Sequence, residues 1–137
     1  MRSSKFGFRA TNGLLLASGL LAAGLAATMF IAPDAIYAVY GIEIGSNVNL
    51  ANELKAPVGV LLITGLLALS GVLRAELVTP ALGTAAGVYL SYGLSRLASV
   101  VIDGVPDIAL VVAAVIEMAV GGACLLRLVH IRRENGE

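Results

Sequence analysis

The sequence contains few charged residues, one histidine, one cysteine and no tryptophan. Charged residues occupy 13% of the 137 positions, against about a quarter in a soluble domain, and 58% of the positions are hydrophobic. The nine basic and nine acidic residues cancel, so there is no excess of positive charge for a nucleic-acid partner. This composition argues against a disordered chain and against a water-soluble enzyme. It indicates a membrane protein.

The scarcity of histidine and cysteine also limits the chemistry. A single cysteine cannot form a disulfide within the chain, and one histidine with one cysteine cannot build the usual zinc sites. The sequence shows no motif for phosphate binding, dinucleotide binding or nucleophilic catalysis. We therefore expect no catalytic residue, no metal and no cofactor, and an enzyme is the least favoured function.

Four stretches with almost no charge are long enough to cross a membrane as helices, since a bilayer core of about 30 Å needs about 20 helical residues. We predict an all-α integral membrane four-helix bundle, formed as a single domain over residues 1–137. The first stretch is longer than the apolar core of a signal peptide, and we expect it to be retained. The predicted spans are about 10–32, 54–73, 78–102 and 107–127.

The charges at the ends of the spans predict the orientation. Seven of the nine basic residues lie on one side: Arg2, Lys5, Arg9, Arg74, Arg127, Arg132 and Arg133. By the positive-inside rule, both termini are cytoplasmic, and we expect the protein in a bacterial inner membrane. The opposite side has an acidic rim, made by Asp34, Glu43, Glu53, Asp103 and Asp107.

The long connection between the first two spans contains two features with open interpretations. A short interfacial helix over 33–40 would place Tyr37 and Tyr40 on one face, either as anchors of a linking turn or as part of a lid over an outward-facing cavity. Pro57 either kinks a helix that begins near Asn49, freeing the carbonyl of Glu53, or occupies the first position of a helix that begins near Ala56.

Two ionisable residues interrupt the apolar spans, Arg96 in the third and Glu117 in the fourth. An ionisable side chain inside a membrane is costly, so by default it is paired and marks a functional position. Glu117 lies about 15 Å and Arg96 about 10 Å below the same outer surface, so the two side chains can meet. The candidate polar cluster around them consists of Glu53, Lys55, Tyr92, Arg96, Ser99, Asp103 and Glu117.

This cluster has three interpretations. It is an internally neutral network that fixes helix register, a pocket for a small polar or amphipathic ligand, or a docking site for another membrane subunit. A separate stripe of small residues recurs every four positions on the third helix, at Gly83, Gly87, Ser91 and Ser95. Such a stripe permits close helix packing, either within the chain or with another subunit, and the within-chain contact is the favoured interpretation.

Several motifs resemble those of a bacterial membrane family known as domain of unknown function 4345. They are Asn-Glu-Leu-Lys-Ala at 52–56, Gly-Leu-Ser-Arg-Leu-Ala-Ser at 93–99, Asp-Gly-Val-Pro at 103–106, and Glu117 followed by Gly121. The resemblance covers nearly the whole chain and implies a four-helix membrane fold, similar in architecture to the DoxX-like small membrane proteins. Where the family usually has Arg, this chain has Lys55, which cannot make a bidentate contact. The resemblance implies no particular activity.

From these observations we expect a small membrane accessory or scaffold protein that associates with itself or with a larger membrane complex. The alternative is a binding or transport module with an outward-facing intramembrane polar pocket for a lipid, a quinone or another small amphipathic molecule. In both cases the partners include membrane lipids, and no nucleic acid.

Overall fold

The computed structural model describes the backbone of residues 2–136 and the side chains of residues 7–134 and 136. The described residues form helices and connecting turns, with no strand among them, so the predicted all-α class is confirmed. The long helices are α1 (Arg2–Ile31), α4 (Val58–Leu73), α5 (Val78–Asp103) and α6 (Ile108–Asn135). The short ones are α2 (Pro33–Ala38), α3 (Val48–Lys55) and the 3-10 helix η1 (Ala75–Leu77).

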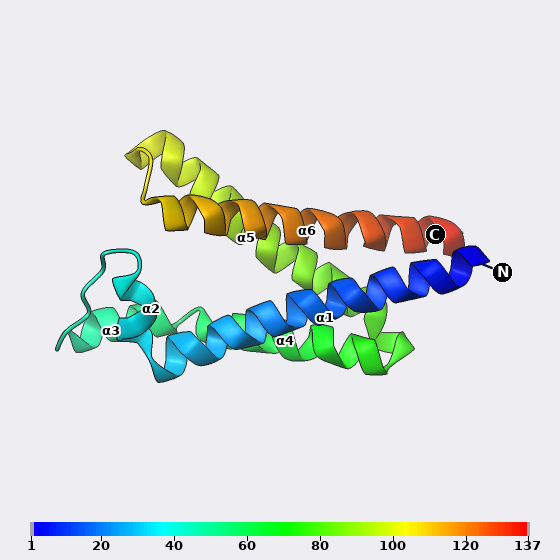
Figure 1. Ribbon diagram of the computed structural model, residues 1–137, viewed down its shortest axis with the longest axis horizontal. Coiled ribbons are helices and arrows are strands. Elements are labelled where there is room, and N and C mark those ends of the chain that lie inside the picture. Colours follow the sequence, from blue (N-terminus) through cyan, green and yellow to red (C-terminus); the bar gives the residue numbers. More distant parts are fainter. Residues whose placement is uncertain (1, 137) are drawn as a thin grey trace.

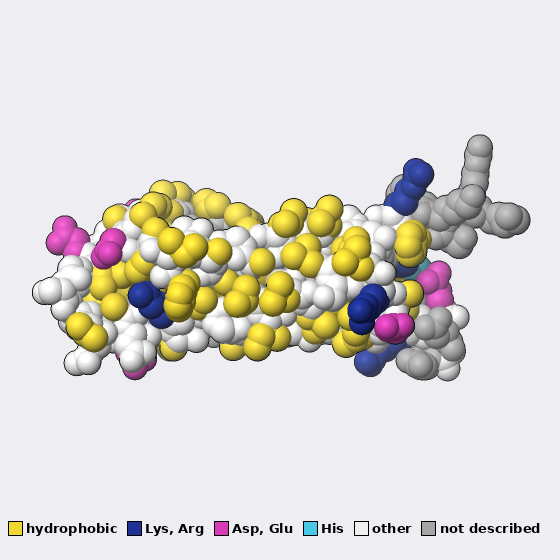
Figure 2. Space-filling model, turned by 90° about the horizontal axis from the view of Figure 1, so that it is seen from below, with side chains coloured by type: hydrophobic (Ala, Val, Ile, Leu, Met, Phe, Trp, Pro, Cys, Tyr) yellow, Lys and Arg dark blue, Asp and Glu magenta, His cyan; other side chains and the backbone are white. Residues whose placement is uncertain are grey.

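Four helical segments are long and apolar enough to cross a membrane: Gly7–Ile31, Val48–Leu73, Ala75–Asp103 and Ile108–Glu134. The chain is therefore a membrane protein with a helical bundle fold. Hydrophobic side chains cover the middle of the face in Figure 2, and charged side chains gather toward its two ends. This distribution suits a hydrocarbon layer between two aqueous surfaces.

The second of these segments is broken at Pro57. α3 ends at Lys55, and α4 begins at Val58 with Pro57 as its N-cap residue. The helical chain thus starts near the earlier of the two predicted positions, but the expected free acceptor is absent: the Glu53 carbonyl accepts a hydrogen bond from the Ala56 N–H at 3.2 Å. In the tight turn at Ala56 and Pro57, the Ala56 N–H thus makes a hydrogen bond to the carbonyl that proline would otherwise leave unpaired.

The four long helices form two pairs. α1 packs along α4 and α5 packs along α6, while α4 and α5, joined by η1, make most of the contact between the pairs. Figure 1 shows the pairs close together at the end that holds the chain termini and separated at the end that holds α2 and α3. The backbones of the two pairs therefore diverge toward the α2–α3 end, which gives the bundle the shape of a wedge.

Glycines allow the close contacts within each pair. A Cβ on Gly65 of α4 would lie 2.7 Å from the Ala23 nitrogen and 2.9 Å from the Gly19 carbonyl oxygen of α1. Between α5 and α6, a Cβ on Gly121 would lie 2.8 Å from a side-chain carbon of Leu90. Such close approach is needed because lipid supplies no hydrophobic force between helices.

The small-residue stripe of α5 does not make these contacts. Gly87, Ser91 and Ser95 are exposed, and a Cβ on Gly87 would meet nothing within 4 Å; only Gly83 has a neighbour, Leu128 at 3.7 Å. The favoured within-chain interpretation is therefore wrong for these three residues. The reason is helical geometry: Tyr89 is buried against α1, and a position two residues away is rotated by about 200°.

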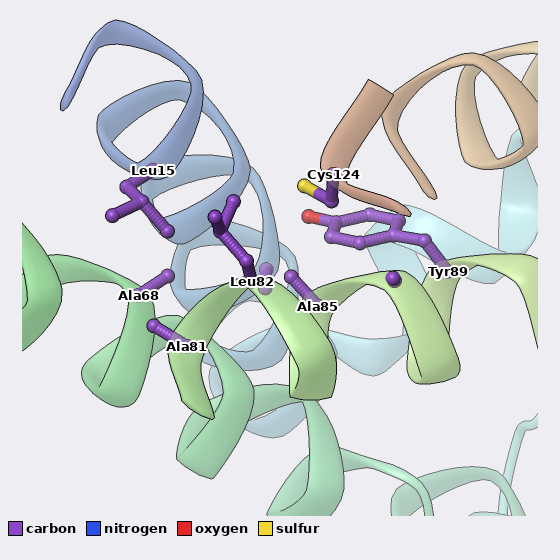
Figure 3. Packing of buried hydrophobic residues seen from close by; sticks show 9 residues of the cluster. Leu15, Ala68, Ala81, Leu82, Ala85, Tyr89 and Cys124 are labelled. Atoms are coloured by element: carbon purple, nitrogen blue, oxygen red, sulfur yellow. The ribbon is translucent and has the colours of Figure 1, made fainter. Parts of the chain in front are cut away.

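Polar side chains join the pairs at the closed end. In the main core, the Tyr89 hydroxyl donates to the Ser18 carbonyl at 2.7 Å, and Figure 3 shows Cys124 of α6 beside the same hydroxyl. Farther toward the termini, Arg127 Nε donates to Thr11 Oγ1 at 2.6 Å. These contacts tie α5 and α6 to α1 and explain why the wedge closes at this end.

Candidate binding site

Arg96 of α5 and Glu117 of α6 form an ion pair in the half of the bundle that lies toward α2 and α3. Arg96 Nε donates to Glu117 Oε2 at 3.0 Å. The Glu117 side chain is 14% exposed and that of Arg96 is 35% exposed, so the pair is half-buried, with the guanidinium on its open side. The spacing of Arg96 before Asp103 and of Glu117 after Asp107 places them at similar depths on antiparallel helices.

The ion pair borders a cavity of about 60 Å³ between the two helix pairs. Tyr92, Arg96 and Glu117 form its polar wall from α5 and α6. The opposite wall comes from α1 and the start of α4 and is apolar, formed by Leu25, Met29, Pro57 and Leu61. The walls of this cavity can therefore contact a polar and an apolar part of one molecule at the same time.

A second cavity, of about 70 Å³, adjoins the first, shares Leu25, Met29 and Arg96 with it, and is bordered by α2. Tyr37 and Tyr40 line it together with Arg96, and their rings meet edge to face with centroids 6.5 Å apart. The Tyr37 hydroxyl donates to the Leu54 carbonyl at 3.0 Å, which fastens α2 to α3. Burial raises the pKa of Tyr37 above its ordinary value of 10.0, and the nearby Tyr40 raises it further. These contacts favour the lid interpretation of this segment.

The remaining residues of the predicted cluster lie elsewhere. The Lys55 ammonium is 5.6 Å from the centroid of the Phe30 ring, in a groove between α1 and α4. Glu53 is exposed, and Ser99 donates to Asp103 at 2.8 Å on the exposed surface of α5. A single cluster is therefore wrong for these four residues, because α3 and α4 pair with α1 while the end of α5 diverges from them.

The apolar wall of the cavity was not found from the sequence. Leu25 and Met29 are four positions apart on α1 and so share a face, but every face of this span is apolar. Hydropathy alone gives no reason to select them. Among the described residues, no group of three or more His, Cys, Asp or Glu side chains is placed to hold a metal ion.

The family described as Domain of unknown function (DUF4345) has a model that matches residues 10–128. The chain belongs to this family. The matched range runs from α1 to α6 and includes Tyr37, Tyr92, Arg96 and Glu117, so the whole site lies inside the DUF4345 region. Neither the curated proteins nor the solved structures include a match to the chain.

Proposed function

We propose that this DUF4345 protein is a membrane-embedded binding module for a small amphipathic molecule, such as a lipid or a quinone, whose polar head contacts Arg96. One observation carries the proposal. Arg96 lines two adjoining cavities, and among the described residues its only hydrogen bond is the one from Nε to Glu117. An arginine has five N–H donors, so four remain for an oxygen-bearing head.

The walls of the site suit such a molecule. A carbonyl, carboxylate or phosphate oxygen would accept from Arg96, while Leu25, Met29 and Leu61 would contact the first carbons of an apolar tail. The cavities, about 60 Å³ and 70 Å³, fit a head group of a few atoms. A longer tail would have to leave these cavities toward the surrounding lipid.

The positions of the basic residues support an outward-facing Arg96 site. They concentrate at the end opposite α2 and α3, so the positive-inside rule puts both termini in the cytoplasm and the site at the outer side of a bacterial inner membrane. Molecules would then reach Arg96 from the outer leaflet or from the outer aqueous surface. In this orientation α2, with Tyr37 and with Tyr40 in the turn that follows, covers the aqueous route.

The test is native mass spectrometry of the protein gently extracted from its own membrane, in which subunit mass and retained small molecules are recorded together. Arg96→Gln removes the proposed head contact, and Ser99→Ala, one turn farther along the exposed surface of α5, is the matched control. We expect a stoichiometric adduct in the wild type and in Ser99→Ala, and its loss in Arg96→Gln. The same adducts in all three proteins would refute the proposal.

A second candidate is the accessory or scaffold role, and the exposed stripe of α5 favours it. Gly87, Ser91 and Ser95 face away from the chain's own helices and leave room for the backbone of another helix. The partner would be a second copy of the chain or a subunit of a larger membrane complex. The two roles are compatible because the stripe and the Arg96 site involve different residues.

A further inference from the structure

The apolar groove between α1 and the α3–α4 junction has a volume of about 410 Å³. Its lining includes three small residues, Ala26, Ala27 and Gly59, and a Cβ on Gly59 would meet nothing within 4 Å. Phe30 and Leu62 also line it and are 63% and 41% exposed. The groove is thus open along its length to whatever surrounds the helices, and its volume falls within the range of about 300 to 1,000 Å³ that is usual for ligand sites.

One charge lies in this groove. Lys55 is the only ionisable residue among those that line it, and its ammonium lies 5.6 Å from the centroid of the Phe30 ring. The attraction between a cation and an aromatic face holds the ammonium at the outer end of the groove. None of the ion pairs formed by the described residues includes Lys55, so no described carboxylate neutralises its charge through an ion pair.

The charges near Lys55 limit the kind of ligand that the groove can bind. Between Arg9 and Arg74, Lys55 is the only basic residue, and the same end of the molecule bears the acidic rim. Lys55 would therefore attract an anionic group, and the acidic residues of the rim would repel it. A ligand that satisfies the groove must combine an apolar chain with an anionic group at one end.

We propose that this groove holds one acyl chain of an anionic phospholipid, with the phosphate on the Lys55 ammonium. A phospholipid suits the open side, since one chain can lie over Ala27 and Gly59 while the second remains in the bilayer. The membrane itself supplies such lipids, and basic positions beside apolar helix surfaces attract their head groups. The site is separate from Arg96 and does not depend on the proposed function.

Native mass spectrometry of the purified protein tests this. The protein is equilibrated with equal amounts of phosphatidylglycerol and phosphatidylcholine of identical chains, and the bound lipids are counted. We expect one retained phosphatidylglycerol, preferred by about fivefold, the effect of about 1 kcal/mol for one lysine near an anionic surface. Lys55→Gln should abolish this preference, and Gly59→Leu, which fills open space, should reduce retention of both lipids.

Arg74→Gln is the matched control, because Arg74 is an exposed basic residue at the other end of α4. It should leave the preference unchanged. The proposal is overturned if Lys55→Gln retains the preference, if Gly59→Leu retains the lipid, or if Arg74→Gln abolishes the preference equally. A parallel titration with oleate, a free carboxylate with a single chain, must displace phosphatidylglycerol only weakly; strong displacement would show a fatty-acid site instead.

Discussion

Arg96 and Glu117 neutralise each other at a depth where neither charge is well tolerated alone. Insertion of an arginine or an acidic residue into the centre of a membrane helix costs about 2.5 to 3.5 kcal/mol. The ion pair offsets part of this cost, but its own desolvation removes much of the electrostatic gain. The pair therefore fixes how α5 and α6 lie against each other more than it raises the stability of the fold.

This view predicts the outcome of a double-mutant cycle. Arg96→Gln and Glu117→Gln should each lower the free energy of unfolding by about 1 to 3 kcal/mol, because each leaves the partner unpaired. The loss in free energy of unfolding of the double variant should be smaller than the sum of the two single losses by about 1 kcal/mol or more. Unfolding in mild detergent, titrated with a denaturing detergent, measures these differences. Simple additivity would show that the 3.0 Å contact contributes nothing.

Substitutions at two glycines, Gly65 and Gly87, should have contrasting effects on the free energy of unfolding. Gly65→Ala places a Cβ 2.7 Å from the Ala23 backbone nitrogen, so α1 and α4 must move apart. We expect a loss of about 1 to 3 kcal/mol, typical of overpacking. Gly87→Ala meets nothing within 4 Å and should not lower stability, because alanine is about 0.5 to 1 kcal/mol more favourable than glycine inside a helix. The same unfolding titration checks both, and equal effects would contradict the assigned helix faces.

At the scale of residues, the sequence predicts which side chains matter better than it predicts what they contact. Arg96 and Glu117 stand out because they are ionisable residues inside apolar spans, and their depth follows from counting. Lys55 was assigned to the same cluster because it lies near the same surface. Its actual neighbour, Phe30, comes from the pairing of α1 with α4, which hydropathy does not encode.

At the scale of elements, α2 is the segment most open to experiment. It has no buried residue, and its attachment to α3 includes the hydrogen bond from Tyr37 to the Leu54 carbonyl. Tyr37→Phe removes this bond, worth about 1 kcal/mol, and should increase the detached population of α2 by about fivefold. Hydrogen exchange of the amides of residues 33–40 measures this. Tyr40→Phe is the matched control, since no hydrogen bond of its hydroxyl occurs among the described contacts.

The same bond predicts a pH dependence. The pKa of Tyr37 is raised above 10.0 by burial, so the attached state favours the protonated phenol. The contribution of the bond is fully present below the pKa of the detached phenol and is lost as the pH rises through the higher pKa of the attached one. The phenolate absorbance of the wild type minus that of Tyr37→Phe should show a midpoint above 10.0. A midpoint at or below this value would contradict the covered position of the ring.

The lengths of the helices could be predicted from the sequence, whereas the helix faces that turn toward the bundle interior could not. Uncharged stretches gave four helices because a membrane imposes a minimum span and requires internal backbone hydrogen bonds. The stripe of Gly83, Gly87, Ser91 and Ser95 is a real periodic feature, but small residues serve equally at contacts within a chain and between chains. The inward face of α5 is shown by its buried residues, which include Leu82, Ala85 and Tyr89.

At the scale of the whole molecule, the wedge links the site to the fold. The pairs are joined at one end by Tyr89 with Ser18 and by Arg127 with Thr11, and they separate at the other. Glu117 and Arg96 lie toward the open end, where the cavities are. Residues of both helix pairs line the first cavity, so its size depends on the distance between the pairs.

The exposed stripe of α5 gives the last prediction, which concerns assembly. If the stripe seats a second copy of the chain, Gly87→Leu and Ser91→Leu should convert the assembled form into monomers, because each adds a bulky side chain where two helix backbones must approach. Gly24→Leu is the matched control: Gly24 is an exposed glycine on α1 with nothing within 4 Å of its Cβ position. Native mass spectrometry gives the subunit number of each protein. A wild type that is monomeric, or one whose assembly survives both stripe variants, would remove self-association through α5 and leave a different membrane subunit as the partner for this face.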